Sequence, residues 1–127
     1  NRSAQFRLPQ NRYCIENRAA DMTMNVYLAF AMTLSAAVEG IKGKIHPGKP
    51  TDQDLYEMSE NEFKKLGIKR LPRNLLMAIE ALKKDKLSDD VLGPVMKKSF
   101  LAYKNDEWER YHQSVTDWEV KEYLRLY

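Results

Sequence analysis

A chain of 127 residues with 43% hydrophobic and 31% charged residues can form one folded domain and is too apolar for a disordered segment. The formal net charge is only +3, and the first 18 residues account for it, because they hold four arginines and one glutamate. A positive field this local favours a small anionic ligand over nucleic acid, which needs basic residues spread along a face. No apolar run approaches membrane-spanning length, and the single cysteine, Cys14, is typical of a reducing, cytoplasmic setting.

The N-terminal segment is expected to supply two strands. A turn over Leu8–Asn11 would connect a first strand to a second one over Tyr13–Arg18. Because side chains alternate along a strand, Glu16 and Arg18 share one face, and Arg7 joins them if the strands pair. Arginines around one carboxylate suit a polyanionic ligand, with the carboxylate free to hold a divalent metal. The alternative is an ordinary solvated strand face, since exposed charge runs are common.

The chain after this segment is expected to be helical. Asn25 would cap a first helix that continues to Gly40, and its face, rich in alanine and methionine, favours close packing against a sheet. A loop rich in proline and glycine follows. Ser59 and Glu62 then form a possible capping box for a short helix that Gly67 ends.

The next two helices are expected to be joined by a short connection. Pro72 suits the first turn of a helix over Arg73–Lys84. The residues expected to face inward on it are Leu75, Leu76, Ile79 and Leu82. Ser88 is expected to cap a short segment that the Gly93-Pro94 pair interrupts, before a long helix over Val95–His112.

A terminal helix is expected to open with a second capping box, formed by Thr116 and Glu119, and to run through Leu126. A terminal helix this rich in aromatic and aliphatic residues usually needs a partner surface. Packing onto its own subunit, with Trp118 in the core, is the alternative.

Other candidate sites are weaker. His46 and His112 lack metal-ligating neighbours at the required spacing, which favours polar surface roles. Cys14 has no histidine near it in the sequence that could activate a thiol.

Two segments, Asn1–Pro9 and Ile15–Asp21, resemble the end of the catalytic domain of the glutamine synthetase family. That family has an NRS-x-x-x-R-[IL]-P segment followed by a strand of the form hydrophobic-E-x-R. The similarity continues along the chain in Asp21–Leu28, Gly40–Gly48, Asp54–Tyr56, Leu71–Arg73, Val115–Glu119 and Glu122–Leu124. The resemblance implies an α+β fold in which residues 1–21 are active-site strands from a larger sheet and residues 22–127 are the helical part.

The resemblance also implies a role for each charged residue of the N-terminal segment. Glu16 would be a ligand of a divalent metal, magnesium or manganese, that bridges to the nucleotide. Arg2 would be catalytic, contacting the ATP phosphates and the activated glutamate. Arg7 would bind ATP phosphate, and Arg18 would hold the carboxylate of the glutamate substrate. Arg12 is the nearest substitute for an ATP-contacting lysine of the family.

The reaction implied is formation of glutamine from glutamate and ammonia, with ATP, through γ-glutamyl phosphate. The E-N-R spelling at Glu16–Arg18 and the segment Val115–Trp118 are also similar to members that use methylamine or polyamines, so the nitrogen donor stays open. A third alternative is a non-catalytic helical assembly module when the chain is isolated.

The family's remaining site residues would lie upstream, so the chain, which lacks an initial methionine, is expected to be part of a longer polypeptide and inactive alone. The resemblance implies a homo-oligomer of stacked rings. The local charge and the lack of a long apolar run predict neither nucleic acid nor membrane as a partner. Tyr56 falls where some bacterial members carry an adenylylated tyrosine, although a structural tyrosine is the alternative.

Overall fold

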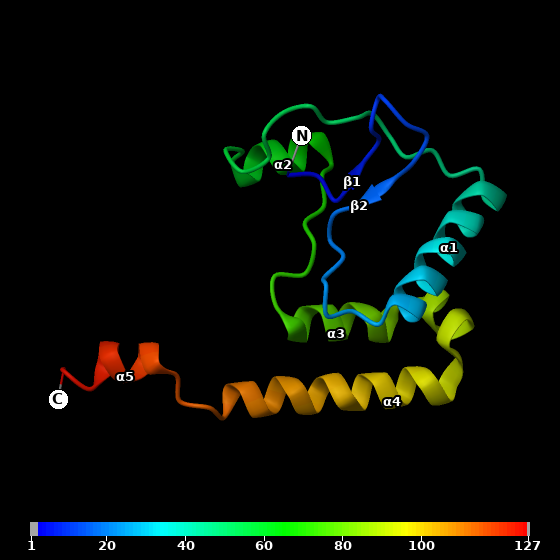
Figure 1. Ribbon diagram of the computed structural model, residues 1–127. Helices are drawn as coiled ribbons and strands as arrows, with labels where there is room; N and C mark the ends of the chain where they lie inside the picture. The colour runs from blue at the N-terminus through cyan, green and yellow to red at the C-terminus, as the bar shows by residue number, and fades with distance from the viewer. Residues whose placement is uncertain (1–2, 127) are drawn as a thin grey trace. The chain divides into compact units, whose positions relative to one another are not determined.

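The computed structural model describes residues 3–126 (Figure 1). Its elements are β1 (Phe6–Arg7), β2 (Glu16–Asn17), α1 (Val26–Lys42), α2 (Glu60–Leu66), α3 (Leu75–Lys84), α4 (Lys86–His112) and α5 (Asp117–Tyr123). One two-stranded antiparallel sheet precedes a mainly helical remainder, which confirms the predicted α+β class. The chain divides into two compact units, Asn1–Arg70 and Leu71–Tyr127. The proposed functional division at residue 21 stays a prediction.

The two strands pair in the first unit, with Phe6 opposite Asn17 and Arg7 opposite Glu16. Their pairing confirms the expected ribbon, but β2 is only two residues long, so the expected strand over Tyr13–Arg18 is too long. The physical reason is that this ribbon has no further strand beside it among residues 3–126, and two-stranded ribbons are marginal in water. The residues between the strands form a loop instead, which is exposed except for the buried Pro9.

Helix α1 begins as predicted, because the side chain of Asn25 accepts a hydrogen bond from the Leu28 N–H at 3.2 Å. It ends at Lys42, two residues beyond the expected end, where Gly43 forms the C-cap. The expected packing against a sheet is not seen among residues 3–126 and stays a prediction for a longer polypeptide. No residue of α1 is buried, and α1 contacts neither strand. The apolar face that the sequence predicts therefore stays exposed in this structure.

Helix α2 has the predicted capping box. The Ser59 hydroxyl accepts from the Glu62 N–H, and the Glu62 carboxylate accepts from the Ser59 N–H at 2.7 Å. Gly67 ends the helix in the left-handed region, with φ of 66°, where glycine is favoured. Phe63 is buried at the centre of the helix, and the Arg70 guanidinium lies 4.0 Å from the centroid of its ring.

Helix α3 starts later than the sequence predicts. The Asn74 side chain caps it by accepting from the Met77 N–H at 2.9 Å, so Pro72 precedes the helix and the prediction that it lies in the first turn is wrong. The asparagine side chain accepts a hydrogen bond from a backbone N–H that has no partner within the helix. Proline at a helix start offers no such acceptor and only lacks an N–H of its own. Of the four residues expected to face inward, Ile79 is buried and Leu76 is exposed.

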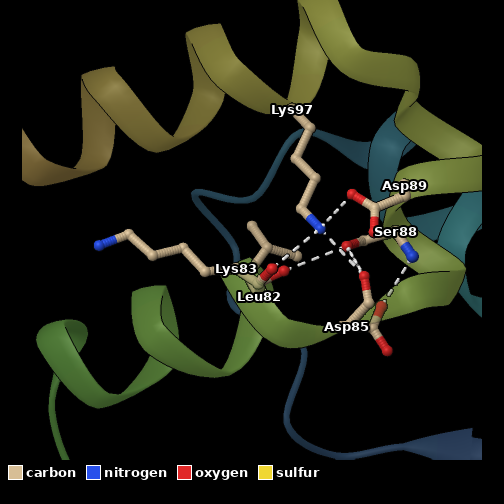
Figure 2. Close-up of polar contacts among 6 residues, drawn as sticks. All are labelled: Leu82, Lys83, Asp85, Ser88, Asp89 and Lys97. Carbon is tan, nitrogen blue, oxygen red and sulfur yellow. Dashed lines mark hydrogen bonds and ion pairs between the residues drawn. The ribbon is translucent and has the colours of Figure 1, made fainter.

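Helix α4 packs on α3 and is capped by Asp85, whose carboxylate accepts from the Ser88 N–H at 2.7 Å. The prediction that Ser88 is the cap is therefore wrong. Ser88 is fully buried inside the first turn, and its hydroxyl donates to the carbonyls of Leu82 and Asp85 (Figure 2). The predicted interruption is confirmed, because Gly93 has non-helical angles, φ 68° and ψ 167°, immediately before Pro94.

A buried lysine joins the two parts of α4 to the end of α3. The Lys97 ammonium donates to the carbonyl of Asp85 at 3.0 Å and to the Asp89 carboxylate at 2.5 Å, and it lies 3.4 Å from the Lys83 carbonyl (Figure 2). Lysine is almost never fully buried unless its charge is paired. These acceptors give the Lys97 ammonium the partners that its burial requires.

Helix α5 has the second predicted capping box, formed by Thr116 and Glu119, and ends at Tyr123, before the expected Leu126. Trp118 is 62% exposed, and its ring lies edge to face with that of Tyr123 at a centroid distance of 6.0 Å. Trp118 lies in no core formed by residues 3–126, and its packing in a complete subunit stays a prediction. No helix formed by residues 3–126 is both long enough and apolar enough to cross a membrane.

Candidate functional site

Strand pairing brings Arg7 and Glu16 together. The two residues are directly opposite in the ladder, where side chains on the same face are close enough to interact. One guanidinium nitrogen of Arg7, Nη1, lies 3.2 Å from Oε1 and 3.1 Å from Oε2 of Glu16. The expectation that Arg7 joins Glu16 if the strands pair is confirmed.

Arg12 reaches the same carboxylate from the loop between the strands. Its Nη2 donates to Glu16 Oε1 at 2.5 Å, so the carboxylate accepts from two guanidinium groups. The hydrogen bond from Arg12 and then that from Arg7 lower the pKa of Glu16 below its ordinary value. In return, the hydrogen bond to Glu16 raises the pKa of Arg12. Glu16 is therefore held as a carboxylate, the form in which it can accept a cation.

Arg18 follows the last residue of β2 and extends the backbone pairing, because its N–H donates to the carbonyl of Gln5 at 2.8 Å. Strand alternation predicts that its side chain shares the face of Glu16, and that placement stays a prediction. Arg2, the residue expected to be catalytic, lies outside the described residues.

One contact of the N-terminal segment could not be predicted from the sequence. The Ser3 hydroxyl accepts a hydrogen bond from the Leu55 N–H at 3.0 Å, across 52 residues of sequence. The contact ties the N-terminal segment to the residue before Tyr56. Only the tertiary fold could reveal it, although the resemblance includes both segments.

The weaker candidates occupy structural positions. The ring nitrogen Nδ1 of His46 accepts from the Gly48 N–H at 3.0 Å, which stabilises a turn. His112 lies against the rings of Trp108 and Tyr111. Cys14 is an exposed free thiol. Neither histidine belongs to a metal-ligating group in the described part of the chain, where no cluster of three histidine, cysteine or acidic residues forms.

The fit of Glu16 to a divalent metal rests on its donor atoms. Magnesium prefers carboxylate oxygens and commonly uses only one or two of them, together with water and phosphate. The Glu16 side chain is 24% exposed, and both of its oxygens contact guanidinium nitrogens of Arg7 or Arg12. Glu16 can supply one ligand position, and the surrounding guanidinium groups are suited to phosphate or carboxylate.

Comparison with known proteins identifies the family of this chain. Residues 1–123 match the family model described as glutamine synthetase, catalytic domain. A glutamine synthetase of Methanocaldococcus jannaschii is 41% identical over 127 residues, which cover 98% of this chain and 28% of that protein. A glutamate–methylamine ligase of Methyloversatilis universalis is also 41% identical, over 100% of this chain and 28% of its own length.

A solved structure described as apo GmaS without ligand is 34% identical and covers 87% of this chain and 25% of that chain, with a TM-score of 0.72. The chain thus spans less than a third of the length of these relatives. Because the family model covers nearly all of its residues, the chain belongs to the glutamine synthetase catalytic-domain family.

Proposed function

We propose that this chain forms the C-terminal part of an ATP-dependent ligase that joins glutamate to ammonia. The observation that carries the proposal is the Glu16 carboxylate with the guanidinium groups of Arg7 and Arg12 around it, within a chain of this family. A carboxylate for a cation beside arginines for phosphate is the charge arrangement that phosphoryl transfer needs.

The reaction begins when the γ-carboxylate of glutamate takes the terminal phosphoryl group of ATP and ADP leaves. Ammonia then attacks the acyl phosphate and releases phosphate. Arg7 and Arg12 hold the nucleotide phosphates, and their charges oppose the negative charge that builds on the transferring group. Arg18 orients glutamate through its carboxylate, and Arg2 contacts both the phosphates and the activated substrate.

Glu16 is proposed to hold one divalent ion, magnesium or manganese. The ion would supply charge neutralisation at the phosphates when it is bound. The hydrogen bonds from Arg12 and Arg7 lower the pKa of Glu16 and so favour its carboxylate form.

A second candidate reaction uses an organic amine in place of ammonia. It is favoured by the similarity to a glutamate–methylamine ligase, which is as high as that to a glutamine synthetase. A polyamine is the other organic amine considered. The rest of the catalytic domain would choose between these donors, because the ammonia site of the family is expected upstream of this chain.

The test is phosphate release by a polypeptide that carries this chain within a complete catalytic domain. Release that requires glutamate, ATP and ammonia supports the first reaction, whereas a kcat/KM that is higher for methylamine or a polyamine supports the second. The isolated 127-residue chain is the control and is expected to show no turnover. Absence of release with every amine would contradict the proposal and favour a non-catalytic assembly module.

A further inference from the structure

Both oxygens of the Glu16 carboxylate are already in contact with arginine. Arg7 Nη1 lies within 3.2 Å of each oxygen, and Arg12 Nη2 donates to Oε1. A cation that approaches Glu16 therefore meets two positive groups, and it must replace the shorter contact at Oε1, which is that of Arg12. The same ion pairs also occupy the guanidinium groups proposed to bind phosphate.

The two arginines differ in how firmly they are placed. Arg7 lies in β1, and strand pairing sets it opposite Glu16. Arg12 lies in the loop between the strands, and its side chain is 63% exposed, against 47% for Arg7. Arg12 is thus the group that can leave the carboxylate while the strand pairing stays intact.

We propose that Arg12 acts as a latch on Glu16: it occupies the carboxylate while no nucleotide is bound and transfers to the nucleotide phosphates on binding. The transfer removes the shorter of the two arginine contacts at Glu16 Oε1, where Arg7 Nη1 remains at 3.2 Å, so the nucleotide and the ion each favour binding of the other. This inference rests on the proposed function of Glu16 and Arg12.

The strength of the latch follows from its exposure. Ion pairs at the protein surface are weak, so Arg12 can exchange one oxygen partner for another at little cost. In the parent, part of the increase in ion affinity that the nucleotide causes comes from removal of the latch. A variant without the latch should therefore gain ion affinity by a certain factor in the absence of nucleotide. The effect of the nucleotide on ion affinity should shrink by the same factor, since coupling between two ligands is reciprocal. For a single exposed pair this factor is roughly two- to five-fold.

The experiment measures manganese binding by isothermal titration calorimetry, with and without a non-hydrolysable ATP analogue. The protein is the polypeptide that carries this chain within a complete catalytic domain. In the Arg12→Gln variant, manganese alone should bind roughly two- to five-fold more tightly than in the parent. The gain in manganese affinity on adding nucleotide should shrink by the same factor.

Two further variants separate the possible failures. Arg110→Gln removes a guanidinium from an exposed pair with Asp106 on α4, at 2.8 Å, and should leave manganese binding unchanged. Glu16→Gln should weaken manganese binding. If it does so while Arg12→Gln binds manganese no more tightly than the parent, the latch is wrong and the metal role stands. If Glu16→Gln binds manganese as the parent does, the metal role and the latch are both wrong.

Discussion

Lys97 and Asp89 form an ion pair across the kink in α4. The Lys97 ammonium lies 2.5 Å from the Asp89 carboxylate, with Gly93 between them in sequence and outside the helical region. The Lys97 side chain is only 7% exposed, whereas that of Asp89 is 61% exposed. The ammonium also donates a hydrogen bond to the Asp85 carbonyl at the junction of α3 and α4. Lys97 therefore connects the part of α4 after the kink to the part before it and to this junction (Figure 2).

Replacement of Lys97 by methionine should destabilise the second unit. The Asp89 carboxylate would lose this donor, and the Asp85 carbonyl would keep only the Ser88 hydroxyl as a donor. A hydrogen bond of this kind typically contributes about 0.5–1.5 kcal/mol. The free energy of unfolding, measured by urea denaturation, checks this. Lys98→Met is the matched control, because Lys98 is the exposed neighbour, and it should change the free energy of unfolding much less. Equal effects of the two variants would contradict the role given to Lys97.

Replacement of Gly93 by alanine should also destabilise the chain. The pair of angles φ 68° and ψ 167° is almost restricted to glycine, and forcing another residue into such a region costs about 1–3 kcal/mol. Gly40→Ala is a control of opposite sign, because Gly40 lies inside α1 and a Cβ there meets no atom within 4 Å. In a helix, alanine is favoured over glycine by about 0.5–1 kcal/mol. Thermal unfolding of both variants should show shifts in opposite directions.

The capping boxes predict a loss of helix at acidic pH. Hydrogen bonds from Ser59 lower the pKa of Glu62, and those from Thr116 lower the pKa of Glu119. A depressed carboxyl pKa contributes stability above the ordinary glutamate value, about 4.3, and that contribution is lost as the pH falls below it. Circular dichroism between pH 6 and pH 2 (roughly the span that brackets these pKa values) should show decreasing helicity. The double variant Glu62→Gln and Glu119→Gln should flatten the decrease, and an unchanged curve would contradict this origin.

Replacement of Glu16 by glutamine should lower the activity of the complete enzyme by roughly two orders of magnitude or more, because it removes a negative charge from the proposed cation site. High manganese concentration should restore part of the activity. Steady-state phosphate release at increasing manganese checks both effects. Glu109→Gln on α4 serves as a control for loss of a carboxylate elsewhere and should retain activity. Parent-like activity in the Glu16 variant would rule out the metal assignment.

Deletion of residues 116–127 should weaken assembly of the complete protein and leave each subunit folded. Trp118 and Tyr123 are 62% and 53% exposed, and apolar side chains on such a short helix usually need a partner surface. Sedimentation velocity at low micromolar concentration should show smaller species than the parent forms. A deletion variant with the parent's oligomer distribution would exclude this role.

What the sequence by itself determined is mainly local. The capping boxes at Ser59 and Thr116 and the interruption at Gly93 could all be predicted, because each depends on residues within one helical turn. The partnership of Arg7 and Glu16 also followed, once strand alternation was combined with pairing. The NRS segment and the strand that contains Glu16 also carried a resemblance to the family whose model matches residues 1–123.

Only the tertiary structure decided the longer-range relationships. A lysine in a charged stretch predicts a solvated surface, and Lys97 is buried only because the end of α3 presents carbonyls to it. The hydrogen bond from Leu55 to Ser3 joins positions 52 residues apart, which no periodicity encodes. The reach of Arg12 to Glu16 depends on a loop where a strand was expected. In each case the path of the backbone decides which partner a polar group reaches. Local sequence preferences do not determine that path, so they do not predict the partner.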